Sequence, residues 1–266
     1  MAGGERIFVQ AIRRYCAGHG IAVDVRAGGW LIAMRRGNER RFAFGYDIGL
    51  NSAIAHRLAN DKSAASEVLA LTGVPCIAHH LFLNPKLGGN VVGAGWRDAM
   101  LELLHENPQG VVIKPNEGTS GRSVFKVTNE AELDHATGEV FSMSTGLVIS
   151  PYVAIEDEVR VVLLSDVPLV VYSKQRGTDW RHNLDAGAKP VLLADGETRT
   201  ACVKLATEAA RAIGIVFASI DLVRVDGDWR VLEINSGVMM EALGKLHPEL
   251  VQATYDAALD RVFGEN

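Results

Sequence analysis

The sequence is poor in cysteine, and its three thiols lie far apart. Cys16, Cys76 and Cys202 form no CxxC pair and are odd in number. The sequence therefore predicts neither a disulfide framework nor a thiolate metal site. The thiols are interpreted as small buried apolar side chains, and unpaired thiols fit a reducing compartment. We therefore expect a cytoplasmic protein.

Long apolar runs and an excess of positive charge are absent as well. No stretch of about 18 uncharged apolar residues occurs, and residues 1–6 carry charged side chains before any apolar run, unlike a signal peptide. The 266 residues include 27 Lys and Arg against 32 Asp and Glu, a formal charge of −5. Neither a membrane nor a nucleic acid is therefore expected as a partner.

The composition that is present is that of an ordinary globular protein, with 48% hydrophobic and 22% charged residues. It excludes disorder of the whole chain and supports a core without covalent crosslinks. Helical and strand periodicities alternate along the chain, with glycine and proline between them. They predict an α+β fold in three parts, with a short N-terminal segment and entry helix in 1–80, a central lobe in 81–149 and a C-terminal lobe in 150–266.

The separate elements follow from the same periodicities. Helices are expected over 7–17, 61–71, 97–106, from about 129, over 200–213 and over 248–263. Strands are expected over 21–26, 30–35, 41–44, near 81, and over 111–113, 123–127, 147–149, 159–164, 169–173, 219–225 and 230–234.

The first chemical signal is an apolar strand that leads into a loop of small residues. Residues 111–113 are apolar, Lys114 follows, and Gly118-Thr119-Ser120-Gly121 comes soon after. Backbone N–H groups of such a loop can approach phosphate oxygens closely. The lysine precedes the glycines, so the GxxxxGK[ST] pattern does not match, and GxGxxG is absent too. Taken alone, the segment is either an anion-binding loop or a plain hairpin with a glycine-rich turn.

The second signal is a hairpin near the C-terminus that brings two carboxylates together. We expect Asp226-Gly227-Asp228 to form a three-residue loop, which fixes the pairing of the two strands. The expected pairs are Val225 with Trp229, Leu222 with Leu232, Ile220 with Ile234, and Asp221 with Glu233. A slip by one residue would place Ile220 against Glu233 and scramble both faces.

Asn235 belongs to the same face as Glu233, because side chains alternate along a strand. Two carboxylates and an amide oxygen then converge on a half-buried face, which is costly unless a cation lies between them. An all-oxygen set is what Mg²⁺ binds, with phosphates and water completing its shell. The alternative is a solvated edge hairpin whose acidic residues are incidental.

Three further polar segments carry weaker signals. Glu158 and Arg160 share one face of a strand, where an ordinary cross-strand ion pair is the alternative to a functional role. Residues 174–187 form a cation-rich loop suited to a terminal phosphate or a carboxylate, or else a mobile surface loop. His79 and His80 are adjacent and point to opposite faces of an extended chain, which favours ordinary core or surface roles over a metal site.

Together these segments resemble the ATP-grasp carboxylate–amine ligases, most closely the RimK-type glutamate ligases and the cyanophycin synthetase and glutathione synthetase branches. The resemblance runs from about residue 51 to 241 and begins with Asn60-Asp61-Lys62 before a helix and Gly73-Val74-Pro75. It implies an ATP-grasp fold, in which two α+β lobes grip ATP. Only a reduced N-terminal α/β segment fits ahead of Asn51, where many relatives carry a full α/β domain.

The resemblance also implies roles for single residues. Those implied in ATP binding are Lys62, Lys114, Glu117, Gly118, Thr119, Ser120, Gly121, Ser150, Tyr152, Val153, Glu158 and Lys174. Those implied as catalytic, beside the γ-phosphate or an acyl phosphate, are Arg160, Arg181 and Asn183. Asp221, Glu233 and Asn235 are the implied ligands of two Mg²⁺ ions, with Mn²⁺ as an alternative metal. Ser236 and Gly237 would begin a substrate-binding loop.

The implied activity is the ligation of a carboxylate to an amine through an acyl phosphate, with release of ADP and phosphate. Amino acids or short peptides are the expected small-molecule substrates, and a homodimer is compatible with the sequence. Departures from the family pattern at Ser150-Pro151, at Lys174 and at residues 238–240 concern the substrate more than the nucleotide. A small-molecule kinase and a non-catalytic ATP-binding regulatory module remain as alternatives.

Overall fold

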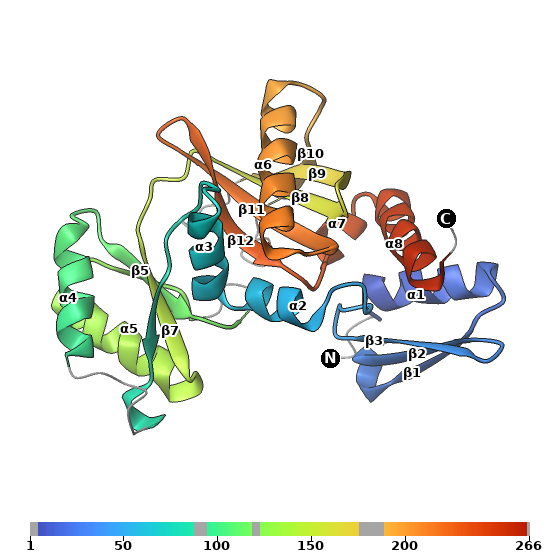
Figure 1. The fold of residues 1–266 in the computed structure, drawn as a ribbon, viewed down its shortest axis with the longest axis horizontal. Coiled ribbons are helices and arrows are strands. Elements are labelled where there is room, and N and C mark those ends of the chain that lie inside the picture. Colours follow the sequence, from blue (N-terminus) through green and yellow to red (C-terminus); the bar gives the residue numbers. More distant parts are fainter. Residues whose placement is uncertain (1–4, 88–94, 119–122, 176–188, 265–266) are drawn as a thin grey trace.

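The computed structural model describes residues 5–87, 95–118, 123–175 and 189–264 (Figure 1). The helices are α1 Ile7–Gly18, α2 Ala53–Asn60, α3 Lys62–Leu71, α4 Trp96–Glu106, α5 Glu130–Met143, α6 Glu197–Ile213, α7 Glu241–Gly244 and α8 Pro248–Phe263. Two short 3-10 turns, η1 Ala27–Gly29 and η2 Pro85–Leu87, interrupt the loops. No helix in the described part of the chain is long and apolar enough to cross a membrane.

The strands form three antiparallel sheets. Their bounds are β1 Ala22–Arg26, β2 Leu31–Arg36, β3 Glu39–Phe44, β4 His80–Leu83, β5 Val111–Pro115, β6 Phe125–Val127, β7 Gly146–Pro151, β8 Asp157–Leu164, β9 Val167–Gln175, β10 Lys189–Leu192, β11 Phe217–Val225 and β12 Asp228–Asn235. Sheet A has the order β1-β2-β3, sheet B the order β10-β9-β8-β11-β12, and sheet C the order β4-β7-β5-β6. The α+β class predicted from the sequence is confirmed.

Sheet C forms the core of one lobe, at the left of Figure 1. Its inner face and the helices α4 and α5 bury a common set of apolar side chains that includes Met100, Ile113 and Leu147. Strand β5, which carries Lys114, is thus held in place by the apolar side chains that it buries in this core.

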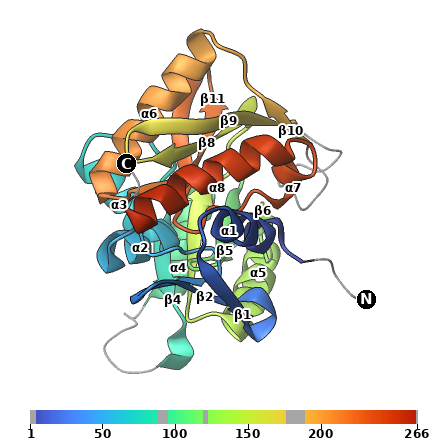
Figure 2. The same cartoon turned by 90° about the vertical axis from the view of Figure 1, so that its right-hand side faces the viewer.

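Sheet B is covered on both faces. On one face, Val161, Ile220 and other apolar side chains pack against α6. On the other face, Val162 and Tyr172 belong to a core that also contains α1, sheet A and α8. Figure 2 shows α8 and α1 lying together on this second side. The N-terminal segment is therefore packed with the last helix of the chain.

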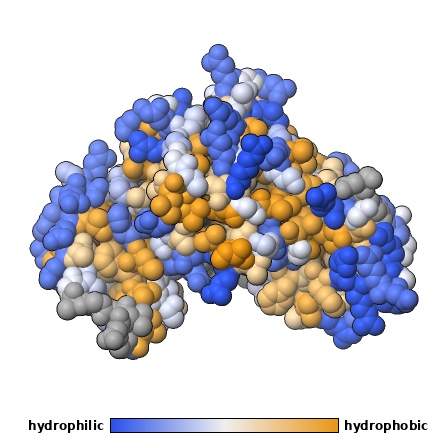
Figure 3. Space-filling model, in the orientation of Figure 1, coloured by the Kyte–Doolittle hydropathy of each residue, from blue (hydrophilic) through white to orange (hydrophobic). Residues whose placement is uncertain are grey.

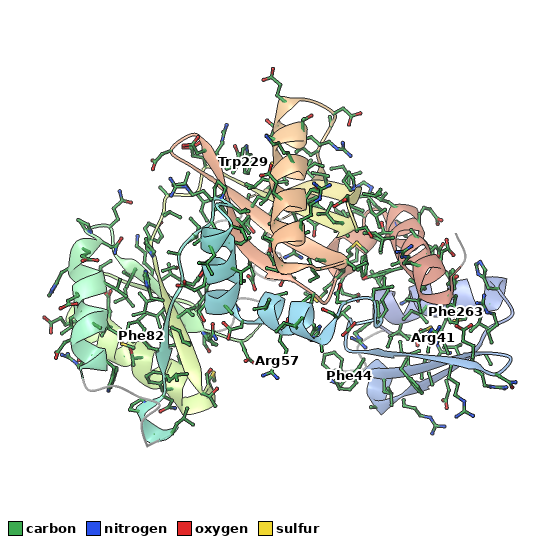
Figure 4. The ribbon with its side chains drawn as sticks, in the orientation of Figure 1. Arg41, Phe44, Arg57, Phe82, Trp229 and Phe263 are labelled. Carbon is green, nitrogen blue, oxygen red and sulfur yellow. The ribbon has the colours of Figure 1, made fainter. Side chains whose placement is uncertain are left out.

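Two arginines of sheet A hold the end of α8. Arg36 Nη2 donates to Phe263 O (2.7 Å) and Arg41 Nε donates to Val262 O (3.2 Å). Carbonyls of the last helical turn have no partner within the helix, so cationic donors stabilise this end. Figure 4 shows Arg41 beside Phe263, whereas Phe44 points away from the protein.

Three short elements were not predicted from the sequence, namely α2, α7 and β10. Helix α2 begins after Ser52, whose hydroxyl accepts from Ala55 N (3.2 Å), and ends at Asn60, directly before Asp61. Asp61 in turn caps α3 by accepting from Ala64 N (2.8 Å). One polar residue thus separates two helices that periodicity alone does not resolve.

The surface in Figure 3 shows hydrophobic residues gathered across the middle of the molecule, over α2 and α3, and hydrophilic residues over α4 and α6. The segment boundaries expected at residues 80 and 149 fall at the start of β4 and near the end of β7. The division of the chain into three parts at these positions stays a prediction.

Candidate functional site

A row of polar side chains crosses four strands of sheet B. Tyr172 of β9 is opposite Arg160 of β8, Arg160 is opposite Asp221 of β11, and Asp221 is opposite Glu233 of β12. Side chains of directly opposed residues emerge on the same face of a sheet. The expected pairing of Asp221 with Glu233 is therefore confirmed, and it extends to Arg160 on the next strand.

The turn of this hairpin differs from the prediction. The loop has two residues, Asp226 and Gly227, and Val225 is opposite Asp228. Both loop residues have positive φ, 52° and 83°, as a type I′ turn requires and as an Asp-Gly pair favours. The predicted pairing of Val225 with Trp229 is wrong for this reason.

A register shift beside Asp221 restores the expected pairing farther from the turn. Leu222 is opposite Val231, so its predicted pairing with Leu232 is also wrong. The shift between Asp221 and Leu222 adds one residue to β12 and compensates for the shorter turn. Ile220 is opposite Ile234, as predicted. The polar end of the hairpin thus has the expected geometry, reached through a different turn and a bulge.

Four charged side chains on this face form a compensated cluster, which we define as Glu158, Arg160, Lys174 and Asp221. Arg160 donates to both oxygens of Asp221, at 2.6 Å each. Lys174 Nζ lies 2.5 Å from Glu158 Oε1 and 3.0 Å from Asp221 Oδ2. Two cations and two carboxylates therefore cancel in a nearly buried site.

The pKa values of the two carboxyl groups move in opposite directions. Burial by itself raises the pKa of Asp221, but Arg160 and Lys174 together hold it well below its ordinary value. Burial raises the pKa of Glu158, and the charge of Asp221 adds to that rise, against the attraction of Lys174. Asp221 is consequently the carboxylate on which this cluster is centred.

A second group of charges, the open cluster, consists of Lys62, Lys114 and Glu233. Lys62 begins α3, and its Nζ lies 3.5 Å from Glu233 Oε1. Lys114 is 9% exposed, and its pKa is lowered to about 8, mainly by burial, with Lys62 adding to the decrease and Glu233 opposing it. The cluster holds two cations against one carboxylate, so it retains net positive charge.

Asn116 joins the two segments that carry these lysines. Its side-chain oxygen accepts from Ser63 N (3.1 Å), and its backbone oxygen lies 3.4 Å from Lys62 Nζ. Lys62 Nζ also donates to Gly118 O (2.9 Å). The start of α3 is thereby fixed to the loop after β5. Asn116 was not singled out from the sequence, although it follows the Lys114-Pro115 pair directly.

The end of β7 and the segment that follows it contain three of the residues implied in ATP binding, Ser150, Tyr152 and Val153. Ser150 is buried, and Tyr152 N donates to Gly110 O (3.0 Å). Lys126 Nζ lies 3.4 Å from the centre of the Tyr152 ring, a cation–π contact. Val153 packs against a small core with Val223. The connection between β7 and β8 is therefore held in place by a backbone hydrogen bond, a cation–π contact and apolar packing.

Ser236 and Gly237 lie between α2 and the N-terminal segment. Ser236 is 1% exposed, and its hydroxyl donates to Asn60 Oδ1 (3.1 Å). A Cβ added to Gly237 would lie 3.3 Å from Tyr46 Cβ, so a larger residue would crowd the loop. Tyr46 was not predicted to lie here, because its approach depends on how sheet A packs.

Five of the predicted residues lie outside the described part of the chain: Thr119, Ser120, Gly121, Arg181 and Asn183. Glu117 and Gly118, which begin the glycine loop, are exposed. The remaining predicted residues lie on β5, β7, β8, β9, β11 and β12, at the start of α3, and in the segments that follow β7 and β12.

The chemistry of the expected metal ligands fits Mg²⁺. The atoms that could bind the ion are the carboxylate oxygens of Asp221 and Glu233 and the amide oxygen of Asn235. Oxygen atoms are the hard ligands that Mg²⁺ prefers. The Glu233 side chain is 24% exposed, and that of Asp221 is 5% exposed and already bound by Arg160. Across the described residues no group of three or more His, Cys, Asp or Glu could hold a metal by itself. Glu233 is thus the accessible member, and the amide of Asn235 is needed to complete a set of three.

A family model described as the RimK-like ATP-grasp domain matches residues 59–248. The chain belongs to this family. The match begins just before Lys62 and ends after the polar hairpin, so both charge clusters lie inside the ATP-grasp region. It does not include α1 or sheet A.

Curated relatives of this ATP-grasp chain are described as probable alpha-L-glutamate ligases. One, from Legionella pneumophila (strain Corby), is 24% identical over 200 residues, covering 74% of this chain and 61% of that protein. Another, from Haemophilus influenzae (strain PittEE), is 29% identical over 209 residues, covering 74% of this chain and 62% of that protein. The chain thus spans about three fifths of the length of these relatives.

Solved structures confirm the ATP-grasp fold. The D-alanine–D-alanine ligase of Bacillus anthracis is similar with a TM-score of 0.59 and 18% identity, over 81% of this chain and 72% of that one. A bifunctional glutathione synthetase from Pasteurella multocida gives a TM-score of 0.56 and 15% identity, over 99% of this chain and 45% of that one. At these identities the likeness concerns the fold alone.

Proposed function

We propose that the chain is an ATP-dependent carboxylate–amine ligase, which forms an amide bond through an acyl phosphate and releases ADP and phosphate. The observation that carries this proposal is the open cluster, in which two buried ammonium groups from separate lobes face one carboxylate. Net positive charge in a low-dielectric setting is what a triphosphate needs. Membership of the RimK-like ATP-grasp family supports the same assignment.

In this proposal the two lysines hold the phosphates of ATP from sheet C and α3. Lys114 is offered by β5 and Lys62 by the first turn of α3, where helix N–H groups add positive potential. Ser150, Tyr152 and Val153 would border the adenine ring, and Glu158 the ribose. The loop of 117–121 would close over the phosphates.

The compensated cluster would orient the groups that take part in phosphoryl transfer. Arg160, together with Arg181 and Asn183, is proposed to stabilise charge on the transferred phosphoryl group and on the acyl phosphate. Asp221, Glu233 and Asn235 would hold Mg²⁺, which when bound neutralises phosphate charge. Lys174 contacts both Glu158 and Asp221 and so holds the two carboxyl groups beside one another.

The proposed substrates are a small carboxylic acid and an amine, both amino acids or short peptides. The relatives named as glutamate ligases motivate this choice of substrate class. Ser236 and Gly237 would line the reacting carboxylate, with Tyr46 behind the loop. The identity of the pair is a matter for screening, and the homodimer stays a prediction.

The proposal is tested by phosphate release from ATP and Mg²⁺ across pairs of amino acids, followed by mass spectrometry of the responding pair. A ligase consumes both substrates and yields a product whose mass is their sum minus one water. Phosphorylation of one substrate without use of the amine would instead identify a kinase. Binding of ATP with no turnover across the whole panel would identify a regulatory module.

Lys114→Ala serves as the loss-of-function variant in this assay, and Lys204→Ala is its matched control. Lys204 is an exposed lysine of α6, away from both clusters. We expect product formation to be lost in the first variant and retained in the second. Equal activity of the two variants would contradict the role given to the open cluster.

A further inference from the structure

The family match covers residues 59–248 and leaves out α1 and sheet A, so it gives no role to the N-terminal segment. This segment is nevertheless packed against the ATP-grasp part of the chain. Helix α7 contacts both α1 and α8, and a Cβ added to Gly244 of α7 would lie 2.9 Å from Ile7 Cδ1. Figure 2 shows α1 and α8 together on this side of sheet B. The contact between the two parts is therefore close enough to fix side chains where they meet.

Helix α1 receives its N-terminal cap from a distant part of the chain. Arg6 precedes the helix and makes no capping hydrogen bond with its side chain, and the first turn has no acidic residue. Instead, Ile7 N donates to Glu241 Oε2 (2.8 Å) and Phe8 N donates to Glu241 Oε1 (3.4 Å). The first N–H groups of a helix have no partner within it, and a carboxylate is a favourable acceptor for them. Glu241 is thus the cap of a helix that begins 234 residues earlier.

Tyr46 of the N-terminal segment binds the same carboxylate. Its hydroxyl donates to Glu241 Oε1 (3.1 Å). Burial, together with the charge of Glu241, raises the pKa of Tyr46 to about 12, so the phenol keeps its proton at neutral pH and acts as the donor. The Arg6 guanidinium lies 4.8 Å from the centre of the Tyr46 ring, and Arg6 Nη1 donates to Gly45 O (3.0 Å). The Tyr46 ring is therefore held in place by its own segment.

The loop of residues 236–240 joins β12 to α7 and meets the N-terminal segment at both ends. At its start, a Cβ added to Gly237 would lie 3.3 Å from Tyr46 Cβ. Directly after its end, Glu241 accepts from the Tyr46 hydroxyl. Between them, the Tyr255 hydroxyl donates to Val238 O (2.9 Å). One tyrosine of the N-terminal segment thus spans the loop that carries the proposed substrate-binding residues.

The nucleotide lysines lie on other elements. Lys114 belongs to β5 and Lys62 begins α3, whereas Glu241 begins α7. A shift of the loop of residues 236–240 should therefore disturb the substrate that binds beside it more than the nucleotide.

We propose that Glu241 is a positioning residue, which ties the loop of residues 236–240 to the N-terminal segment and so fixes the site of the carboxylate substrate. The inference rests on the proposed function, in which Ser236 and Gly237 line the reacting carboxylate. It assigns nothing to Glu241 in the chemical step. The expected consequence of losing its carboxylate is a higher KM for the carboxylate substrate, with kcat and the KM for ATP largely unchanged.

Steady-state kinetics on the full chain, with the substrate pair that responds in the phosphate-release screen, measures this difference. We expect Glu241→Ala to raise the KM for the acid about tenfold. Glu241→Gln keeps one acceptor oxygen and Tyr46→Phe removes one hydrogen bond, so each should raise it about threefold. Glu208→Ala, which changes an exposed glutamate of α6, should leave both KM values unchanged. Equal rises in the KM for ATP and for the acid, or no rise in either, would overturn the inference.

A double-mutant cycle tests whether Tyr46 acts through Glu241. Because the Tyr46 hydroxyl donates to Glu241, Tyr46→Phe should cause no further rise in the KM for the acid once residue 241 is alanine. Rises that multiply in the double variant would contradict the coupling.

Amide hydrogen exchange provides a readout that needs no turnover. Glu241→Ala should speed exchange in residues 236–240 and at Ile7 and Phe8, with no change over β5. Faster exchange over the whole chain would identify a general loss of stability and overturn the inference. If the alanine variant does not fold, Glu241→Gln and Tyr46→Phe decide the matter by the same measurements.

Failure of this inference is distinguishable from failure of the proposed function. A wild-type protein that forms no amide with any pair contradicts the ligase, and hydrogen exchange still decides whether Glu241 ties the loop to the N-terminal segment. A wild-type ligase whose Glu241 variants keep the wild-type KM values and exchange rates contradicts the positioning role alone.

Discussion

The two charge clusters lie on neighbouring parts of one site and differ in how their charges are balanced. In the compensated cluster, Arg160 and Lys174 meet Asp221 and Glu158 in buried ion pairs of 2.5 to 3.0 Å. In the open cluster, Lys62 pairs with Glu233 at 3.5 Å, and Lys114 makes no ion pair within the described residues. A neutralised group of charges supports the structure, whereas an excess of positive charge attracts a ligand. We therefore interpret the compensated cluster as the part that stabilises the site and the open cluster as the part that binds a ligand.

Removal of Lys114 should have the largest effect on activity and little effect on stability. We expect Lys114→Ala to lower kcat/KM for ATP by about a thousandfold, because it removes the buried cation that we propose to face the phosphates. Its melting temperature should not fall, because burial disfavours the charged form of Lys114 in the folded protein and lowers its pKa to about 8. Steady-state kinetics and a thermal melt on the same sample check both parts. A large fall in melting temperature with near-normal kinetics would contradict the distinction between the open and the compensated cluster.

Removal of the Asp221 side chain should lower the free energy of unfolding much more than removal of the Glu233 side chain. Asp221→Ala leaves Arg160 buried without its carboxylate and Lys174 with Glu158 alone, which should cost about 3–5 kcal/mol of unfolding free energy. Glu233→Ala breaks one longer and partly exposed pair, for which about 0–1 kcal/mol is expected. Urea unfolding of both variants at pH 7 measures the difference. Equal costs would show that the clusters are not distinct.

The pH dependence of ATP binding should report on Lys114. Burial lowers its pKa to about 8, from an ordinary value of 10.5, so ATP affinity should fall as the pH rises through about 8 and the ammonium is lost. Between these two values the unfolded chain keeps a proton that the folded chain has released. The contribution of Lys114 to stability therefore rises with pH in that window.

Lys114→Arg provides the check on this assignment, because a guanidinium stays charged throughout the range. The alkaline fall in ATP affinity should disappear in this variant, even if its affinity at pH 7 is lower. An unchanged alkaline fall would assign the titration to another group.

The smallest effect is expected for Lys174→Arg. The compensated cluster depends on its balance of charge, and arginine keeps the bonds to Glu158 and Asp221 within reach. We expect a change in unfolding free energy below about 1 kcal/mol, against about 3 kcal/mol for Lys174→Ala. Denaturant unfolding of the two variants shows whether stability depends on the positive charge of residue 174 or on the shape of its side chain. A large loss in both would mean that the packing of the lysine stem matters more.

Local patterns in the sequence were sufficient for part of the site. Strand alternation placed Asp221 opposite Glu233, and that pairing is present. The turn was wrong by one residue, since a bulge is not visible in an alternating apolar pattern. The pairing of Arg160 with Asp221 could not be derived, because it requires knowing that β8 lies next to β11.

Contacts between segments that are far apart in the chain could not be predicted from the sequence. Tyr46 reaches Gly237 only because sheet A packs with α8 and the loop after β12. His79 and His80 were expected to have ordinary core or surface roles, and His79 is buried. What the pattern did not show is that the Nε2 atom of His79 would lack a hydrogen-bond partner among the described residues, beside a small cavity that Lys62 also lines.

The transfer of labelled oxygen tests the central claim most directly. The carboxylate substrate is prepared with ¹⁸O in both oxygens and incubated with the protein, ATP, Mg²⁺ and the amine. An acyl phosphate passes one carboxylate oxygen to the released phosphate, so each amide formed should yield one phosphate with a single ¹⁸O. An amide product accompanied by unlabelled phosphate would contradict the account.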